Sequence, residues 1–167
     1  MKSYEVEQKY RLKNPAAARK VLRDMGAKKI RSGFESNELF DFSGILRSCS
    51  SVLRLRRFGN EKQGLLTFKG PCLKSRYKKR VEIETLILWG KARALLQDAG
   101  FEIARKYSKS REEFLLAKTH VTLDRLREKG WFLEIEGKPA EIANLEKKLG
   151  LSAKDRENRT YLQILEK

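Results

Sequence analysis

Charged side chains recur at every second position in several strand-like segments of this chain. They are Glu5, Glu7 and Lys9, then Arg54 and Arg56, Arg80, Glu82 and Glu84, Lys109 and Arg111, and finally Glu134 and Glu136. Side chains two residues apart on a strand project from the same face of the sheet, so each segment carries a charged stripe. Acids and bases mixed on one face could bind divalent metal ions and a polyanion. Carboxylates hold hard cations, whereas Arg and Lys neutralise negatively charged oxygens.

The same alternation is also typical of an ordinary half-buried sheet, in which the charged stripe faces water and the intervening residues form the core. Those intervening residues are apolar here: Val6, Leu53, Leu55, Val81, Ile83, Leu133 and Ile135. For any single Glu or Arg on a strand, a solvated outer face is the default interpretation. Repetition in strand after strand also suits the lining of a polar barrel.

Composition limits the class of protein and of partner. The 167 residues suit one domain, predicted to span 1–167, with a sizeable core. Lys and Arg number 38 against 22 Asp and Glu, and the resulting net charge of +16 favours anionic partners such as nucleic acid or polyphosphate. The chain has two cysteines, no signal-like segment and no apolar run long enough to span a bilayer. We therefore expect a cytoplasmic protein with free thiols and no membrane partner.

Hydrophobic periodicity predicts short strands interrupted by a few helices. Helical spacing and terminal Pro and Gly signals predict helices over Pro15–Met25, Trp89–Ala99 and Pro139–Leu149. Strands are predicted at about 5–12, 35–42, 51–59, 64–69, 78–87, 101–116, 119–124 and 131–137. Eight antiparallel strands can close on themselves and so remove their edges. The predicted fold class is α+β, an eight-stranded antiparallel closed β-barrel with flanking helices.

The sequence resembles the CYTH superfamily, the triphosphate tunnel metalloenzymes that include class IV adenylate cyclases and thiamine triphosphatases. Its Glu5-Val6-Glu7-Gln8-Lys9 segment has the Glu-x-Glu-x-Lys signature of that family. The resemblance continues in the family's order through Leu53–Arg56, Leu66–Pro71, Ser75–Lys78, Arg80–Glu84, Lys109–Arg111, Leu123-Asp124, Glu134–Glu136 and Tyr161. It implies a barrel, open at both ends, whose inner wall carries acids and bases in equal number. The net positive charge would then lie outside that wall.

The resemblance also implies roles for individual residues. The positions that match the family's phosphate-binding residues are Lys9, Arg54, Arg56, Lys69, Lys109 and Arg111, and we predict that Arg80 joins them. Glu5, Glu7 and Glu134 match metal ligands, with Glu136 and Asp124 as further candidates. The expected metal is Mg²⁺ or Mn²⁺. Glu5, Glu7 and Lys9 are the predicted catalytic residues.

Purely structural roles remain open for some of these residues. Arg80, Glu82 and Glu84 are predicted to line the tunnel, where they could equally form salt bridges between strands. Asp124 could instead end a strand or begin a turn before Arg125.

Three functions are consistent with the sequence. The first is metal-dependent hydrolysis of the phosphoanhydride of a nucleoside, thiamine or inorganic triphosphate. The second is a class IV type adenylate cyclase, which converts ATP to cyclic AMP and pyrophosphate. Best-known members of that class carry a His-Phe pair shortly before the motif, where this chain has Met1-Lys2-Ser3-Tyr4. The third is a non-catalytic module that binds RNA or polyphosphate on its basic surface. The sequence leaves the oligomeric state open, a homodimer included.

Overall fold

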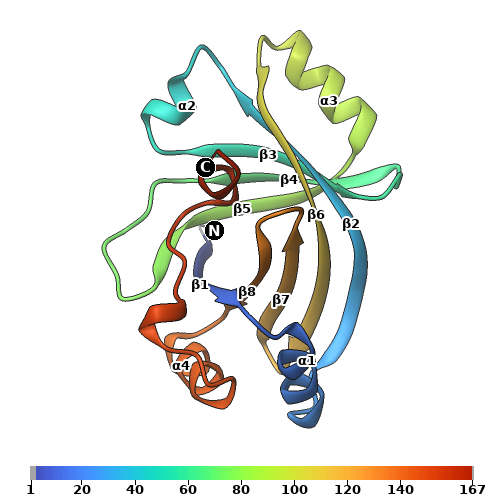
Figure 1. The fold of residues 1–167 in the computed structure, drawn as a ribbon. Helices are drawn as coiled ribbons and strands as arrows, with labels where there is room; N and C mark the ends of the chain where they lie inside the picture. Colours follow the sequence, from blue (N-terminus) through green and yellow to red (C-terminus); the bar gives the residue numbers. More distant parts are fainter. Residues whose placement is uncertain (1–2, 167) are drawn as a thin grey trace. The chain divides into compact units, whose positions relative to one another are not determined.

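The computed structural model of the chain describes residues 3–166, and Met1 and Lys2, which precede the Glu-x-Glu-x-Lys motif, lie outside them. The strands are β1 (Ser3–Leu12), β2 (Lys28–Asp41), β3 (Val52–Phe58), β4 (Gln63–Lys69), β5 (Lys78–Leu88), β6 (Glu102–Leu116), β7 (Thr119–Leu126) and β8 (Gly130–Glu136). The helices are α1 (Pro15–Asp24), α2 (Ile45–Ser48), α3 (Trp89–Asp98), α4 (Pro139–Lys148) and α5 (Tyr161–Leu165), with a 3₁₀ turn at Ala153–Asp155. Figure 1 shows these elements coloured along the chain.

The eight strands form a closed antiparallel barrel in the order β1-β5-β4-β3-β2-β6-β7-β8. This confirms the predicted α+β fold class and the predicted closure. The chain also divides into two compact units. Unit 1 contains the start of β1 through Glu5 together with Phe34–Ser108, and unit 2 contains Val6–Gly33 and everything from Lys109 onward. Three strands, β1, β2 and β6, contribute residues to both units.

Unit 1 has one apolar and one polar sheet face. Its buried core consists of Phe40, Leu55, Trp89 and Leu96, so that α3 covers the apolar face of β3 and β4. The register pairs Lys69 with Glu82 and Thr67 with Glu84. Residues opposite each other in antiparallel strands project to the same side, so these polar side chains share the face that α3 does not cover.

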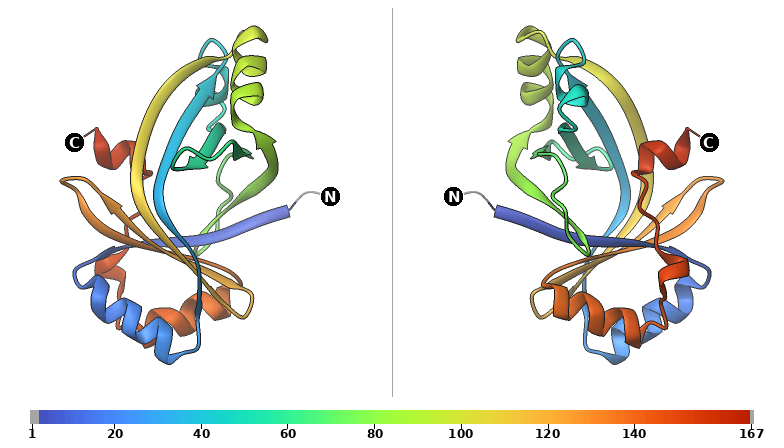
Figure 2. Two further views of the ribbon diagram at one scale, coloured as in Figure 1. Left: turned by 90° about the vertical axis from the view of Figure 1, so that its right-hand side faces the viewer. Right: turned by 90° about the vertical axis from the view of Figure 1, so that its left-hand side faces the viewer.

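Unit 2 repeats this division. On the apolar side of its strands, Leu133, Ile135, Val121 and Leu123 are completely buried. Helices α1 and α4 lie at the same end of the unit in both views of Figure 2. Their buried residues, Ala18 and Leu22 in α1 and Ile142 and Leu145 in α4, supply the other half of this core.

Local sequence signals explain the boundaries of α1. The side chain of Asn14 accepts a hydrogen bond from the Ala17 amide at 3.0 Å, and Pro15 occupies the first helical turn. After the helix, Gly26 adopts φ of +80°, a left-handed conformation that glycine reaches at little cost.

Two expectations about the strands were wrong. Strand β2 begins at Lys28 rather than near residue 35. The sequence did not reveal this earlier start because Lys28–Phe34 is largely exposed and lacks the alternation that marks a half-buried strand. Ile83 was expected in the core but is 55% exposed. Ile83 is not among the residues of β5 that pack against the core beneath α3.

Cys49 and Cys72 are free thiols, and both are exposed. Within residues 3–166, none of the helices has the length and apolarity needed to cross a membrane.

Candidate active site

The polar face of unit 1 carries a group of ion-paired side chains that we call the Lys69 cluster: Glu5, Glu35, Arg54, Arg56, Lys69, Arg80, Glu82 and Glu84. Lys69 Nζ donates to both carboxylate oxygens of Glu5 at 2.7 and 2.9 Å and lies 2.8 Å from Glu82 Oε2. Arg80 Nε also donates to Glu5, at 3.2 Å. Two carboxylates therefore converge on one ammonium group.

The ionisation of Glu82 reflects these neighbours. Burial disfavours its charged form, but the charge of Lys69, hydrogen bonds with Glu5 and Lys69, and the charge of Arg54 together outweigh burial and hold the pKa of Glu82 below its ordinary value. Glu82 is thus a carboxylate at neutral pH. It can accept hydrogen bonds or bind a cation.

Arg56 forms the other half of the Lys69 cluster. Its Nη2 donates to Glu84 at 3.1 Å, and its Nη1 lies 3.7 Å from Glu35. Thr67 and Asn37 complete this part by donating to Glu84 and Glu35 respectively. The buried Arg56 Nε and Asn37 Oδ1 have no hydrogen-bond partner within the described part of the chain. A buried donor without an acceptor is costly, so Arg56 Nε is a spare donor for a ligand oxygen.

Unit 2 carries a second group, the Lys109 cluster: Lys9, Lys109, Arg111, Asp124, Glu134 and Tyr161. Asp124 is completely buried at its centre. It accepts from Lys109 Nζ at 2.8 Å and, in a fork, from Arg111 Nε and Nη2 at 2.7 and 2.6 Å. Arg111 Nη2 also donates to Glu134 at 2.8 Å. Asp124 therefore fixes the positions of two cations that the sequence assigned to phosphate binding.

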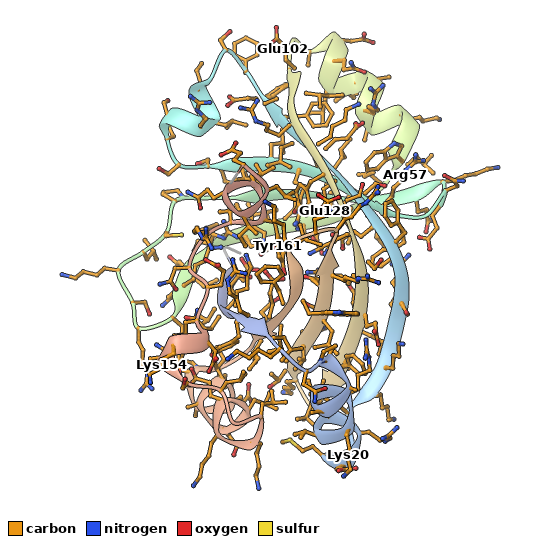
Figure 3. The ribbon with its side chains drawn as sticks, in the orientation of Figure 1. Lys20, Arg57, Glu102, Glu128, Lys154 and Tyr161 are labelled. Carbon is orange, nitrogen blue, oxygen red and sulfur yellow. The ribbon has the colours of Figure 1, made fainter. Side chains whose placement is uncertain are left out.

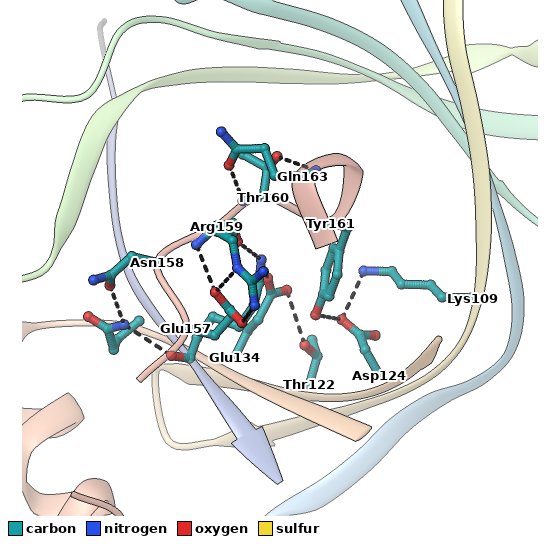
Figure 4. A network of polar contacts seen from close by, with 12 residues as sticks. Lys109, Thr122, Asp124, Glu134, Glu157, Asn158, Arg159, Thr160, Tyr161 and Gln163 are labelled. Atoms are coloured by element: carbon teal, nitrogen blue, oxygen red, sulfur yellow. Dashed lines mark hydrogen bonds and ion pairs between the residues drawn. The ribbon is translucent and has the colours of Figure 1, made fainter. Parts of the chain in front are cut away.

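Tyr161 joins this cluster from the first turn of α5. Its hydroxyl donates to Asp124 Oδ2 at 2.6 Å, and its ring centroid lies 3.8 Å from Lys9 Nζ and 4.3 Å from Lys109 Nζ. Figure 4 shows the side chain pointing from α5 toward Asp124, and Figure 3 shows Tyr161 in the interior while Lys20 and Lys154 point outward. Burial and the nearby Asp124 carboxylate raise the pKa of Tyr161 well above its ordinary value. The phenol therefore keeps its proton and acts as a donor.

Residues 156–161, which we call the C-terminal strap, hold Tyr161 in place. Glu157 accepts from Arg159 Nε at 2.8 Å and from Arg11 Nε at 3.0 Å. The hydrogen bonds from Arg159, opposed by burial and assisted by Arg11, lower the pKa of Glu157 to about 2. Its partners are about half and a third exposed, so solvent screens these pairs.

We expect Glu157→Gln to weaken the protein in a pH-dependent way. A carboxyl whose pKa is lowered by folding stabilises the native state fully above its unfolded pKa, near 4.5, and loses that contribution as pH falls toward about 2. The variant should be less stable than wild type by about 1 kcal/mol at pH 7, with the difference shrinking below pH 4. Urea denaturation at several pH values measures this. A difference that grows on acidification would contradict the assignment.

The sequence-predicted residues are distributed as follows. Glu5, Arg54, Arg56, Lys69, Arg80, Glu82 and Glu84 meet in the Lys69 cluster, and Lys9, Lys109, Arg111, Asp124 and Glu134 meet in the Lys109 cluster. Glu7 and the exposed Glu136 are opposite each other in the register of β1 and β8. Asp124 lies inside β7 and not at a turn, which removes the alternative role considered for it.

Several polar residues of these clusters were not among the predicted site residues. Glu35 and Asn37 follow the same every-second-residue spacing in β2, so the signal was present but was not applied to that strand. Tyr161 was noted as one of the positions that resemble the family, but it was given no role in the site. Glu157 and Arg159 belong to an irregular segment, where no periodicity could single them out.

Comparison with known proteins identifies the family. The model of the CYTH domain matches residues 3–161, which is nearly the entire chain. The chain belongs to the CYTH domain family. No protein of curated function matches the sequence significantly.

Solved structures share the CYTH fold over the full length of this chain. A candidate adenylate cyclase from Vibrio parahaemolyticus is 27% identical, with 100% of both chains covered and a TM-score of 0.85. The PH1819 protein from Pyrococcus horikoshii is 29% identical over 96% of this chain and 97% of its own, with a TM-score of 0.75. A Hippeastrum protein, described as an adenylyl cyclase candidate with a dominant triphosphatase activity, is 16% identical over 99% of this chain and 95% of its own, with a TM-score of 0.72. The similarity to the Hippeastrum protein concerns the fold alone.

Proposed function

We propose that this CYTH protein is a metal-dependent enzyme that hydrolyses a phosphoanhydride bond of a triphosphate. The observation that carries the proposal is the pairing of buried cations with carboxylates on the polar face of each unit, with a spare buried donor at Arg56. A protein core does not need such groups for stability, because apolar side chains of similar volume serve as well or better. A polyanion and its counter-cation do need them.

The cations of both clusters are proposed to bind phosphate oxygens. Arg forks and Lys ammonium groups form short, charge-assisted hydrogen bonds with such oxygens. The proposed phosphate-binding residues are Lys9, Arg54, Arg56, Lys69, Arg80, Lys109 and Arg111. Glu5, Glu82, Asp124 and Glu134 keep these cations in fixed orientations, which favours the stabilisation of developing negative charge on the transferred phosphoryl group.

The carboxylates fit a hard divalent cation. Glu7 lies directly opposite Glu136 in the antiparallel register, so the two carboxylates project from the same side of β1 and β8. Within residues 3–166, no group of three or more His, Cys, Asp or Glu side chains could hold a metal ion by itself. Mg²⁺ usually takes only one or two protein carboxylates together with substrate phosphates and water. Glu5, Glu7, Glu134 and Glu136 are therefore the proposed ligands of Mg²⁺ or Mn²⁺, with Asp124 better placed to hold Lys109 and Arg111. When bound, the metal would supply Lewis-acid charge to the phosphate oxygens.

Adenylate cyclase activity is the second candidate. It is favoured by the description of the 27% identical Vibrio parahaemolyticus protein as a candidate adenylate cyclase. The two reactions differ in the attacking oxygen. Water attacks phosphorus in hydrolysis, whereas the ribose 3′ hydroxyl attacks the α-phosphorus of ATP and releases pyrophosphate in cyclisation.

Product analysis should separate these activities. We expect the purified protein to release orthophosphate from ATP, thiamine triphosphate or inorganic tripolyphosphate in the presence of Mg²⁺ or Mn²⁺, and to lose this turnover when EDTA is added. Ion-exchange chromatography resolves cyclic nucleotide, diphosphate, pyrophosphate and orthophosphate. Cyclic AMP with pyrophosphate would instead support the cyclase. Salt-sensitive binding of polyphosphate or RNA without turnover would replace both with a non-catalytic module.

A further inference from the structure

The C-terminal strap crosses one edge of the Lys109 cluster and is fastened to β1. Tyr10 and Arg156 form an antiparallel bridge, and the Glu157 amide donates to the carbonyl of Lys9 at 2.9 Å. Gln8 Nε2 donates to Asn158 Oδ1 at 3.4 Å. These contacts, together with the ion pairs of Glu157, fix the backbone of the strap beside the strand that carries Lys9.

Within the cluster, the strap uses neutral groups to contact cations. Lys9 Nζ donates to the Arg159 carbonyl at 3.0 Å, and the ring of Tyr161 lies against the ammonium groups of Lys9 and Lys109. Lys9, Lys109 and Arg111 form ion pairs with Asp124 and Glu134 in this cluster, and Arg111 Nη1 also lies 3.9 Å from Glu113 Oε1. A carbonyl oxygen and an aromatic face thus contact the two ammonium groups beside these carboxylates. Both are weaker partners for ammonium than a phosphate oxygen is.

Burial prevents an anion from reaching these ammonium groups while the strap is in place. Lys109 is 2% exposed and Lys9 is 8% exposed. A phosphate oxygen must approach an ammonium nitrogen to about 2.8 Å to bind it. The Tyr161 ring covers both nitrogens and is itself nearly fully buried. Binding of phosphate to Lys9 and Lys109 therefore requires that the strap move.

We propose that the C-terminal strap is a displaceable cover of the Lys9–Lys109 pair and competes with the anionic substrate for it. This inference rests on the proposed function, because it takes the cations of the Lys109 cluster as phosphate-binding groups. In the free protein the Arg159 carbonyl and the Tyr161 ring act as an internal substitute for the anion. When a phosphate chain binds, its oxygens replace them and the segment that begins at Arg156 detaches from β1.

The ion pairs that Glu157 forms in the strap are suited to release. Arg11 is 49% exposed and Arg159 is 36% exposed, and ion pairs of such residues contribute little to stability. The apparent affinity of a ligand for a covered site is its intrinsic affinity reduced by the fraction of molecules in which the site is open. Weakening the strap should therefore tighten anion binding.

Two variants weaken the strap without changing a residue of the Lys109 cluster. Glu157→Gln removes the charge that pairs with Arg11 and Arg159, and Asn158→Ala removes the contact with Gln8. The matched control is Asp24→Asn, which removes the charge of an exposed pair with Lys20 in α1. Isothermal titration calorimetry with inorganic tripolyphosphate, in buffer containing EDTA so that turnover does not consume the probe, measures affinity alone. We expect about fivefold to tenfold tighter binding by the two strap variants and no change in the control.

A disulfide that fixes the strap in place should weaken anion binding. Counting outward from the Tyr10–Arg156 bridge in antiparallel register places residue 158 opposite residue 8. The double variant Gln8→Cys/Asn158→Cys, made together with Cys49→Ser and Cys72→Ser, can therefore form a disulfide across the strap. We expect the oxidised protein to bind tripolyphosphate about tenfold more weakly than the same protein reduced with dithiothreitol. The Gln8→Cys single variant in the same background should not respond to dithiothreitol.

Hydrogen exchange supplies a readout that does not depend on affinity. Saturating tripolyphosphate should speed amide exchange in residues 156–166 while slowing it in β6 and β7. Unchanged affinity in the strap variants, weaker binding by them, or greater protection of the strap on binding would each overturn the inference and leave the proposed function standing. Failure of wild type and all variants to bind tripolyphosphate in EDTA, together with no turnover of any triphosphate in Mg²⁺ or Mn²⁺, would overturn both.

Discussion

Asp124→Ala should reduce the free energy of unfolding by about 3–5 kcal/mol, the effect expected when one partner of a buried ion-pair network is removed. Asp124 is completely buried and accepts hydrogen bonds from Lys109, Arg111 and Tyr161. Without it, two buried cations and a phenol lose their common acceptor. Of the ion pairs described for these cations, those of Lys9 and Arg111 with Glu134 and of Arg111 with Glu113 would remain.

Chemical denaturation monitored by circular dichroism measures this loss. The control is Asp24→Ala, which removes a carboxylate of the same type from an exposed pair with Lys20 and should cost less than about 1 kcal/mol. Asp124→Asn separates charge from shape, because the amide can still accept one hydrogen bond. It should fall between wild type and the alanine variant. A loss for Asp124→Ala no larger than that for Asp24→Ala would show that Asp124 does not hold the cluster together.

Glu5→Gln and Glu7→Gln are each expected to lower metal-dependent turnover of triphosphate by at least about 100-fold. The substitution keeps the shape of the side chain and removes its negative charge. Glu7→Gln removes a proposed metal ligand opposite Glu136, whereas Glu5→Gln also disturbs Lys69 and Arg80, from which Glu5 accepts hydrogen bonds. Steady-state rates measured as a function of Mn²⁺ or Mg²⁺ concentration test the roles.

The metal dependence distinguishes a ligand from a structural residue. A lost ligand shifts the metal concentration needed for half-maximal rate, and excess metal partly restores the rate. A purely structural residue gives a lower rate with the same metal dependence. The matched control is Glu128→Gln, since Glu128 is exposed in the turn after β7 and should leave turnover unchanged. Wild-type rates in Glu7→Gln would refute its assignment as a ligand.

The regular elements of this protein could be predicted because each leaves a periodic signal. The alternating residues of β3, β4 and β8 and the Pro and Gly positions around α1 predicted their elements to within a few residues. The first half of β2 could not be found in this way, since Lys28–Phe34 is largely exposed and lacks a core-facing stripe. Helix α2 has four residues and no buried side chain, which is too short for a helical period to appear.

The candidate site was predictable to the extent that it follows strand alternation. Lys109 and Arg111 are two residues apart, and the structure brings both onto Asp124 from the neighbouring strand. The contribution of Tyr161 depends on where an irregular segment crosses β1. No spacing in the sequence specifies such a crossing. The side of the sheet on which a polar strand residue lies can therefore be predicted from the sequence. The contacts of a residue in a connecting segment can be read only from the folded structure.

The pairing of β1 with β8 has a consequence for the synthesis of the chain. Lys9 is opposite Glu134, so β1 is paired, on this side, with a strand that is synthesised much later. Until β8 emerges, the backbone groups on that edge of β1 lack their partner, and unpaired strand edges favour association with other chains. The alternating charges of β1, which belong to the proposed metal and phosphate site of the finished protein, would also keep this unpaired edge soluble.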